Sequence, residues 1–238
     1  MRRIMFYLLT MIFVLTTCFQ VCEKDDDMYD PDDNIERPSL VVSVNGDISV
    51  GNFETGTVGT VTFSRFPVTV NEWKRVREQI GETMMGAVTL QIMAGELYMR
   101  DAAAGEECVR LNCIKTEATS FIGHAKDRKG DRPYQFASLL KGSSPANGYN
   151  PTKPYTIEFE VRTIGSPITH STYYEADVYT FFVAMSGRST EFQYISVLKT
   201  PRPDEAGERG KYYIMNSTSN ITMQCQQKTF TVDYNGLD

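Results

Sequence analysis

Helical and β-strand patterns occupy separate stretches of this 238-residue chain and do not alternate along it. Helical spacing of apolar residues is concentrated between about residues 72 and 111, whereas four strand-like segments follow one another between residues 155 and 215. A parallel sheet would alternate strands with helices, so this order argues against one. The sequence therefore predicts an α+β fold in which central helices pack on an antiparallel sheet that ends in a C-terminal β-meander.

The C-terminal strands have the clearest pattern. Residues 155–162 alternate, with Ile157, Phe159 and Val161 on one face and polar side chains on the other. Such alternation is typical of a strand with one buried face. Asn45-Gly46 is a turn signal that follows an earlier strand-like segment. The remaining strand-like segments are residues 40–44, 59–66, 178–185, 192–198 and 212–215.

The first predicted helix covers residues 72–80. Thr69 stands three residues before Glu72, which is the spacing of a capping box, where two side chains bond backbone amides at a helix N-terminus. Apolar residues follow at helical intervals. Gly81 is then expected to end the helix.

A second and more apolar helix is expected over residues 83–100. Its apolar residues form the broad stripe that a helix packed across a sheet requires. A strand is the alternative, because Val88, Leu90 and Ile92 alternate with polar residues. In addition, Gly86 and Gly95 would each cost a helix about 1 kcal/mol relative to alanine.

The rest of the middle region is less regular. A short third helix is expected at residues 106–111. Residues 112–142 allow no assignment, apart from residues 126–132, whose mixed charges are typical of a solvated loop.

The N-terminus has the pattern of an export signal. Arg2 and Arg3 precede an apolar run over residues 4–21, which is the order of regions in a secretory signal peptide. No A-x-A cleavage site follows, and Cys22 is instead followed directly by Glu-Lys-Asp-Asp-Asp. Because the apolar run is at the lower limit for spanning a bilayer, an uncleaved membrane anchor is the alternative.

This arrangement resembles the start of a mature Bacteroidetes lipoprotein, in which a lipid-modified cysteine is followed by acidic residues that direct the protein to the cell surface. The resemblance implies a lipoprotein signal peptide at residues 1–21, a lipidated Cys22, and a lipid-anchored location at the outer membrane or cell surface. The three residues before Cys22 are larger than the residues expected there, so Cys18 is the alternative acceptor.

Residues 22–38 are predicted to be the lipidated cysteine and an acidic, disordered tether. Residues 23–38 hold eight acidic residues against two basic ones, and few apolar residues that could support a fold. The several acyl chains of a lipoprotein cysteine would attach this tether durably to the membrane. Residues 39–238 are then expected to form a single domain just clear of the lipid.

Charge and motifs exclude several function classes for this domain. Most of the net charge of −6 lies in the tether, so the domain is nearly neutral and lacks the basic surface of nucleic-acid-binding proteins. No glycine-rich phosphate-binding motif occurs. Cys108 and Cys113, followed by His124, have no second ligand pair for zinc. We therefore expect no nucleic acid, no metal and no cofactor.

The sequence assigns no function to the cysteines and histidines of the domain. Cys108, Cys113 and Cys225 are an odd number, so buried free thiols are expected, although a disulfide between two of them is the alternative outside the cytoplasm. His124 and His170 lie in polar surroundings, and the sequence does not place either beside a nucleophile.

Glu158 and Glu160 share one face of a predicted strand, with side chains about 6–7 Å apart. Glycosidases use a pair of carboxyl groups, so an exported hydrolase with a carboxylate-based site is the alternative function. However, such a pair must flank the scissile bond, which suits a cleft better than an exposed strand. Ion pairing with Arg162 or with neighbouring lysines is therefore expected, and no catalytic residue is assigned.

Turn and strand motifs follow a fixed order in the second half of the chain. They are R-P-Y at residues 132–134, G-x-x-P-x-N-G-Y at residues 142–149 and P-Y-T at residues 154–156. Over roughly residues 68–226 this order resembles a bacterial family of domains of unknown function, which implies no activity. Residues 188–190 depart from the family pattern.

Three tyrosines of these motifs, Tyr134, Tyr149 and Tyr155, are candidate ligand-stacking residues. The surrounding prolines favour an extended loop, on which the rings can stack against a sugar or a peptide. Half-buried tyrosines within a turn are the alternative. We therefore predict a cell-envelope lipoprotein with a non-enzymatic domain that binds an envelope glycan or protein.

Overall fold

The computed structural model of the chain describes residues 37–163, 165–187, 191–199, 210–222, 225, 226 and 228. Contacts divide the chain after Arg37, and the described residues from Pro38 onward belong to one unit. Both candidate lipid acceptors, Cys22 and Cys18, lie outside the described residues, as do the signal peptide and nearly all of the predicted tether.

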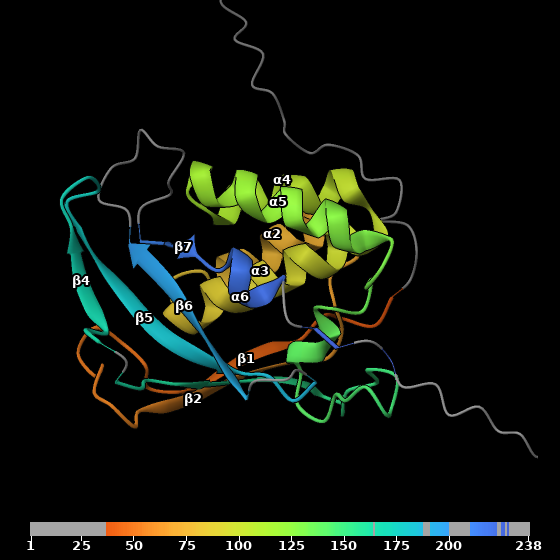
Figure 1. The fold of residues 1–238 in the computed structure, drawn as a ribbon, viewed down its shortest axis with the longest axis horizontal. Coiled ribbons are helices and arrows are strands. Elements are labelled where there is room, and N and C mark those ends of the chain that lie inside the picture. The colour runs from red at the N-terminus through yellow and green to blue at the C-terminus, as the bar shows by residue number, and fades with distance from the viewer. Residues whose placement is uncertain are drawn as a thin grey trace, which may run out of the picture. The chain divides into compact units, whose positions relative to one another are not determined.

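Seven strands in the described part of the chain form one antiparallel sheet (Figure 1). Their order is β1-β2-β3-β5-β6-β7, and β4 also pairs with β5. The strands are β1 (Val42–Gly46), β2 (Val58–Phe63), β3 (Tyr155–Glu160), β4 (Ile168–Ser171), β5 (Ala176–Ala184), β6 (Phe192–Lys199) and β7 (Tyr212–Asn216). The last four form an antiparallel meander, because each pairs with the next along the chain. This confirms the predicted α+β class.

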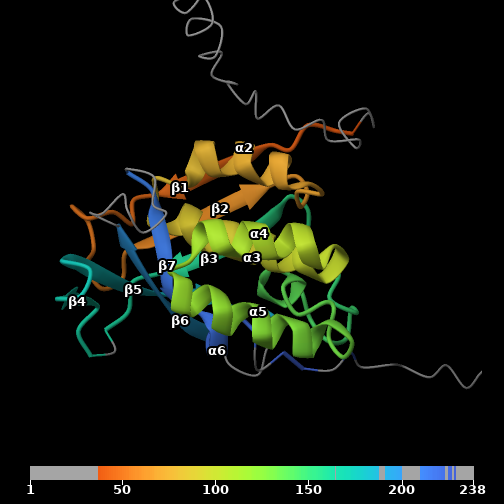
Figure 2. The same cartoon turned by 90° about the horizontal axis from the view of Figure 1, so that it is seen from above.

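The chain between β2 and β3 forms four helices on one face of the sheet (Figure 2). They are α2 (Val70–Ile80), α3 (Met84–Arg100), α4 (Ala102–Asn112) and α5 (Lys115–Lys129). A 3₁₀ turn, η2 (Ala137–Leu139), and a short helix, α6 (Thr218–Ile221), follow later. No helix that the structure describes is long and apolar enough to cross a membrane.

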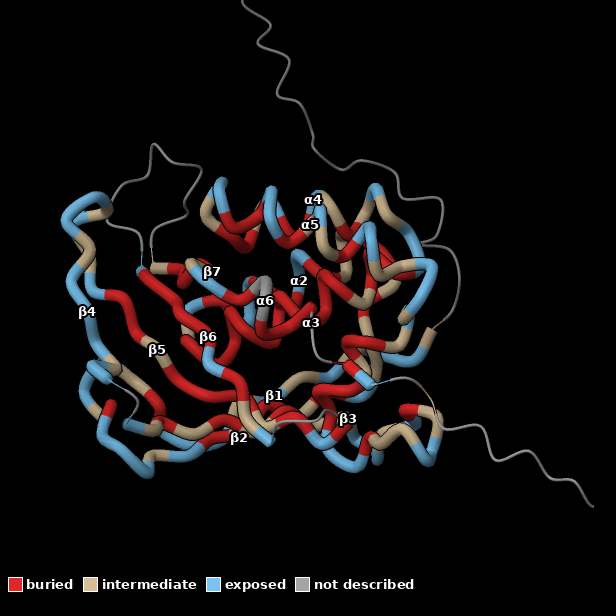
Figure 3. The backbone as a smooth tube through the Cα atoms, viewed as in Figure 1, coloured by how far each residue is buried: buried red, intermediate tan, exposed pale blue. Residues whose placement is uncertain are grey.

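Helix α3 is the centre of the core. All of its 17 residues except Glu96 and Arg100 are buried (Figure 3). A helix that is apolar all round must be covered on every side. Strands β2, β6 and β7 pack on α3, as do helices α2, α4 and α5, and the sheet curves around it (Figure 1).

The two glycines that seemed unfavourable in this helix are sites of close approach. A Cβ atom at Gly95 would meet the ring of Phe136, and one at Gly86 would meet the carbonyl of Ile80. Each glycine therefore allows a neighbour to pack directly on the backbone of α3, which offsets its low helix propensity. The helix expected over residues 83–100 is confirmed, and the alternative strand is wrong.

The predicted start of the first helix is also confirmed. Thr69 is the N-cap, and its hydroxyl accepts a hydrogen bond from the Glu72 amide at 3.1 Å. The Glu72 carboxylate accepts a bond from the Val68 amide at 2.8 Å and pairs with Arg65. The end of the preceding loop is thereby fixed to the first turn of α2.

Three expectations from local sequence need correction. Asn45-Gly46 does not form a turn but ends β1, because both residues pair with β2 and this pairing outweighs the local turn preference. Residues 126–129 form the last turn of α5, where basic side chains are favourable, and are not a loop. The short helix expected at residues 106–111 extends over the whole of α4.

Candidate functional site

Strand alternation gives the sheet two different faces. Val61, Phe63 and Ile157 point into the core and are at most 1% exposed. Their neighbours along the strands, such as Thr60 and Glu158, point the other way and are partly exposed. We call the side of the sheet that carries these residues the outer face.

The pairing register sets the order of side chains on the outer face. Asn45 pairs with Thr60, and Thr60 pairs with Glu158, so an amide, a hydroxyl and a carboxylate lie side by side across three strands. The next row begins with Val58 and Glu160, which also pair with each other. Residues from distant parts of the sequence thereby become neighbours.

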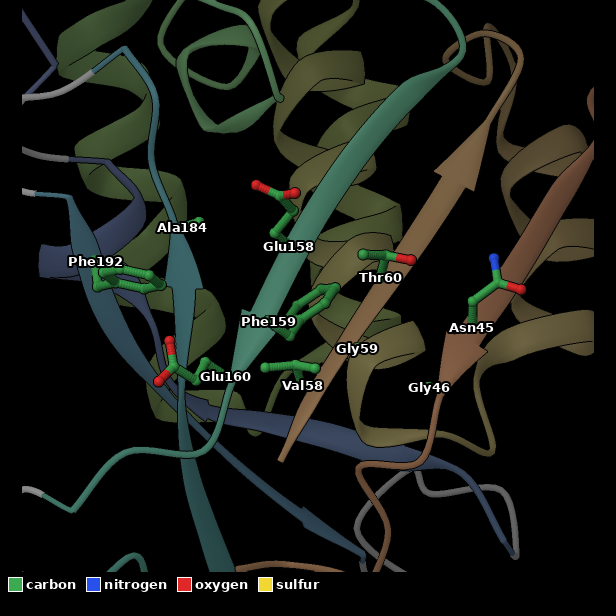
Figure 4. Close-up of a pocket in the computed structure, with 10 residues that line it drawn as sticks. All are labelled: Asn45, Gly46, Val58, Gly59, Thr60, Glu158, Phe159, Glu160, Ala184 and Phe192. Carbon is green, nitrogen blue, oxygen red and sulfur yellow. The ribbon is translucent and has the colours of Figure 1, made fainter. Parts of the chain in front are cut away.

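An open pocket of about 430 Å³ lies on this outer face (Figure 4). Residues of five strands line it: Asn45 and Gly46 of β1, Val58, Gly59 and Thr60 of β2, Glu158, Phe159 and Glu160 of β3, Ala184 of β5, and Phe192 of β6. In Figure 4 the side chains of Glu158, Thr60 and Asn45 follow one another across the strands, and Glu160 lies beside Phe192.

Both carboxylates of the pocket have a cationic partner. Lys141 Nζ lies 2.7 Å from Glu158 Oε1, and an Arg162 nitrogen lies 2.9 Å from Glu160 Oε2. The Arg162 guanidinium also stacks on the ring of Phe192, 3.4 Å from its centroid. The predicted ion pairing of the two glutamates, with Arg162 and with a lysine, is confirmed.

These ion pairs are accessible to solvent. The side chains of Lys141 and Glu158 are 58% and 40% exposed, and those of Arg162 and Glu160 are 39% and 27% exposed. Exposed pairs contribute little to stability, at most about 1 kcal/mol each. Each carboxylate also has acceptor sites beyond the one that its cation occupies, so it can accept hydrogen bonds from a ligand while the ion pair stays in place.

The three candidate stacking tyrosines occupy two separate places. Tyr134 and Tyr149 stack on each other, with ring centroids 4.7 Å apart. Tyr155 lies elsewhere, with its ring centroid 5.6 Å from that of Phe63 and 5.4 Å from that of Phe66. The structure thus brings together Tyr134 and Tyr149 but not Tyr155, and none of the three lines the outer-face pocket.

The N-G-Y motif folds as a tight turn around two side chains. The Asn147 side chain accepts a hydrogen bond from the Ser144 amide at 2.9 Å. The Tyr149 hydroxyl lies 3.0 Å from the Gly187 carbonyl and 2.7 Å from the Gln226 carbonyl, within a buried environment. The motif therefore joins the loop before β3 to the end of β5 and to the C-terminal segment.

The thiols of Cys108, Cys113 and Cys225 are free and buried, as expected. Burial raises the pKa of the Cys108 thiol, and the neighbouring Glu107 carboxylate raises it further. Burial also raises the pKa of Cys113, whose Sγ lies 3.1 Å from the Gln91 side-chain oxygen. Thiols that stay protonated are poor nucleophiles and poor metal ligands.

The two histidines lie away from the pocket, His124 partly buried and His170 exposed. His124 Nδ1 lies 3.0 Å from the Ser120 carbonyl of its own helix, and His170 Nδ1 lies 3.0 Å from Asp177 on the neighbouring strand. Across the described ranges, no three His, Cys, Asp or Glu side chains gather where a metal ion could bind.

Four side chains of the pocket had no signal in the sequence. Thr60 and Phe192 belong to segments with ordinary strand patterns, Asn45 was assigned to a turn and Val58 to no element, and only the register of the sheet brings them beside Glu158 and Glu160. Strand alternation could indicate which face each side chain takes, but not which residues would be neighbours across strands.

The fold and the pocket define an α+β domain whose helices cover one face of an antiparallel sheet and whose other face carries an open pocket lined by both polar and apolar residues. Residues 65–229 match the family described as Domain of unknown function (DUF6935), and this chain belongs to that family. The match includes the R-P-Y, N-G-Y and P-Y-T motifs, whose resemblance to a family of domains of unknown function is confirmed. No curated protein and no solved structure matches the chain.

Proposed function

We propose that this chain is a lipid-anchored protein of the cell envelope whose domain binds an envelope glycan or protein, without catalysis, on the outer face of its sheet. The pocket carries this proposal. Hydroxyl, amide and carboxylate groups from separate strands converge there, beside the exposed apolar Val58, on an open face. An open face of this kind suits binding, whereas hydrolysis favours a cleft that surrounds the reacting bond.

Catalysis by Glu158 and Glu160 is the alternative function. A glycosidase holds its two carboxyl groups on either side of the bond that breaks. Here both groups come from one strand and each is paired with a cation, which favours a role as hydrogen-bond acceptors for a bound molecule.

The proposed location rests on the N-terminal sequence. The apolar run, Cys22 and the acidic residues after it have the order found in surface lipoproteins. As a flexible coil, residues 23–38 would have a mean reach of about 20–25 Å, which would hold the domain near the membrane.

Metabolic labelling with an alkyne fatty acid tests the anchor, and protease treatment of intact cells tests the location. We expect label on the full chain and on the Cys18→Ala variant, no label on Cys22→Ala, and cleavage of the wild-type protein by external protease. Label on Cys22→Ala but not on Cys18→Ala would move the acceptor to Cys18. Membrane retention of both variants without any label would refute lipid anchoring.

An assay of released reducing ends separates binding from hydrolysis. Detergent-solubilised full-length protein is incubated with four oligosaccharides: cellotetraose, tetraacetylchitotetraose, tetragalacturonate and the chitosan tetramer. We expect no product above that of a Glu158→Gln and Glu160→Gln double variant. Product formed by the wild type and lost in the double variant would establish the hydrolase instead.

A further inference from the structure

The geometry points to a neutral, polyhydroxylated glycan chain as the ligand of the outer-face pocket. This inference rests on the proposed function, because it names the ligand class of the same site. Three properties of the pocket carry it: its balance of charge, the spacing of its hydrogen-bonding groups, and the apolar side chains beside them.

The charges around the pocket are already balanced. Glu158 and Glu160 are compensated by Lys141 and Arg162 at hydrogen-bond distance. An anionic ligand would meet two carboxylates in the lining of the pocket, and a cationic ligand would have to replace protein cations that are already in place. A neutral ligand avoids both costs.

The polar row matches a ligand with many hydroxyl groups. Asn45 can donate and accept hydrogen bonds, Thr60 can do the same, and the ionised Glu158 can only accept. Neighbouring strands are about 4.8 Å apart, so the lining from β1 to β6 extends about 19 Å across the sheet. A hydroxyl group is both donor and acceptor, and a chain of sugars laid across the strands would present one to each of these groups.

Apolar side chains lie directly beside this polar row. Val58 is 61% exposed and pairs with Glu160. Glu160 also pairs with Phe182, which pairs with Tyr194, and the Tyr194 side chain is 43% exposed. Aromatic side chains offer apolar faces on which the C–H face of a sugar ring can pack. A purely apolar ligand would instead leave the polar row without hydrogen bonds, which is costly once water is excluded.

Calorimetric titration of the detergent-solubilised full chain tests the ligand class. The probes are cellotetraose and tetraacetylchitotetraose, which are neutral, tetragalacturonate, which is anionic, and the chitosan tetramer, which is cationic. We expect one or both neutral probes to bind at least tenfold more tightly than either charged probe. Tighter binding of a charged probe would overturn the inference while leaving the proposed binding face intact.

Two matched pairs of variants locate the bound probe. Glu158→Gln is compared with Glu107→Gln, because Glu107 is an exposed glutamate of α4 that pairs with Lys74 of α2. Tyr194→Ala is compared with Tyr173→Ala, since Tyr173 is 71% exposed in the loop between β4 and β5. We expect about tenfold weaker binding for the Glu158 and Tyr194 variants and unchanged binding for both controls. Equal effects within both pairs would refute binding at this face.

Failure of every probe to bind the wild type would also overturn the glycan inference. In that case, a photo-crosslinking phenylalanine analogue is placed at position 194 or 173 in living cells. This experiment tests whether the outer face binds a protein instead. A discrete protein adduct from position 194 alone would support a protein ligand on the same face. No adduct from either position would refute the proposed function as well.

Discussion

The ring of Tyr134 stacks on the ring of Tyr149, with centroids 4.7 Å apart and an angle of 14° between the planes. Lys228 places its ammonium 4.7 Å from the centroid of the Tyr134 ring, and its amide donates a hydrogen bond to the Tyr134 hydroxyl at 3.3 Å. Arg132 donates to the Cys225 carbonyl. The R-P-Y and N-G-Y motifs thus hold the C-terminal segment against the domain.

Replacing Tyr149 by phenylalanine should destabilise the protein by about 1–3 kcal/mol, because the buried carbonyl group of Gly187 would lose its hydrogen-bond donor and the contact with the carbonyl of the exposed Gln226 would be lost as well. Urea unfolding followed by circular dichroism measures the loss. Tyr194→Phe is the matched control, since this tyrosine is 43% exposed and its loss of a hydroxyl should change stability by less than about 0.5 kcal/mol. Equal midpoints for the two variants would contradict a tie through Tyr149.

Alanine substitution at two helical glycines, Gly105 and Gly123, should change the stability of the protein in opposite directions. A Cβ atom at Gly105 of α4 would meet the backbone of Tyr98, so Gly105→Ala should cost about 1–3 kcal/mol. Gly123 of α5 is exposed and has open space around it, so Gly123→Ala should stabilise the protein by up to about 1 kcal/mol. Thermal unfolding measures both, and stabilisation by Gly105→Ala would show that α3 and α4 can separate without loss.

Glu117 joins α5 to the chain after β7. Its Oε1 atom accepts hydrogen bonds from the amide and the hydroxyl of Ser217, at 2.6 and 2.7 Å in a buried environment. Hydrogen bonds to charged groups are among the stronger ones, so Glu117→Gln should cost about 1.5–3 kcal/mol in urea unfolding. The exposed Glu107→Gln change should cost less than about 0.5 kcal/mol. Comparable losses would mean that the Ser217 contact contributes little.

Glu96 of α3 should make stability depend on pH. Its side chain is only partly exposed, and the loss of hydration at the carboxyl group raises the pKa of Glu96; Arg100, with its Nε 4.0 Å from Glu96 Oε1, only partly opposes this rise. Glu96 thus has a higher pKa in the folded protein than in the unfolded chain. At pH values between these two pKa values, the folded protein binds more protons than the unfolded chain. The stability contributed by Glu96 is fully present below the unfolded pKa and falls as pH rises through the folded one.

The Glu96→Gln variant tests this direction. Glutamine cannot ionise, so the variant should be more stable than the wild type at pH 7, and the difference should narrow towards pH 4. Urea unfolding at several pH values measures it, with the exposed Glu107→Gln as control. A difference that stays constant with pH would show that Glu96 does not titrate differently on folding.

Local patterns were sufficient where secondary structure depends on neighbouring residues. The Thr69 cap and the alternation that buries Ile157 and Phe159 are both present in the structure. Helix α5 was missed although Ala118, Phe121, Ile122 and Ala125 stand at helical intervals, because two of these four residues are alanines and the rest of the helix is polar, so the apolar stripe is weak.

The outer-face pocket could not be predicted for a different reason. Asn45 and Thr60 are more than 90 residues from Glu158 in the sequence, and they meet it only through the register of three strands. Alternation indicated that Glu158 and Glu160 share a face, but strand pairing across four inserted helices has no local signature.

The enclosure of α3 by the sheet and by three helices determines how its backbone meets water. Amide protons of β4, whose residues are mostly exposed, can exchange with solvent through local fraying. Those in the middle of α3 can exchange only when the surrounding layers separate, which amounts to global opening. Deuterium uptake in this one helix should therefore report the free energy of unfolding of the whole domain.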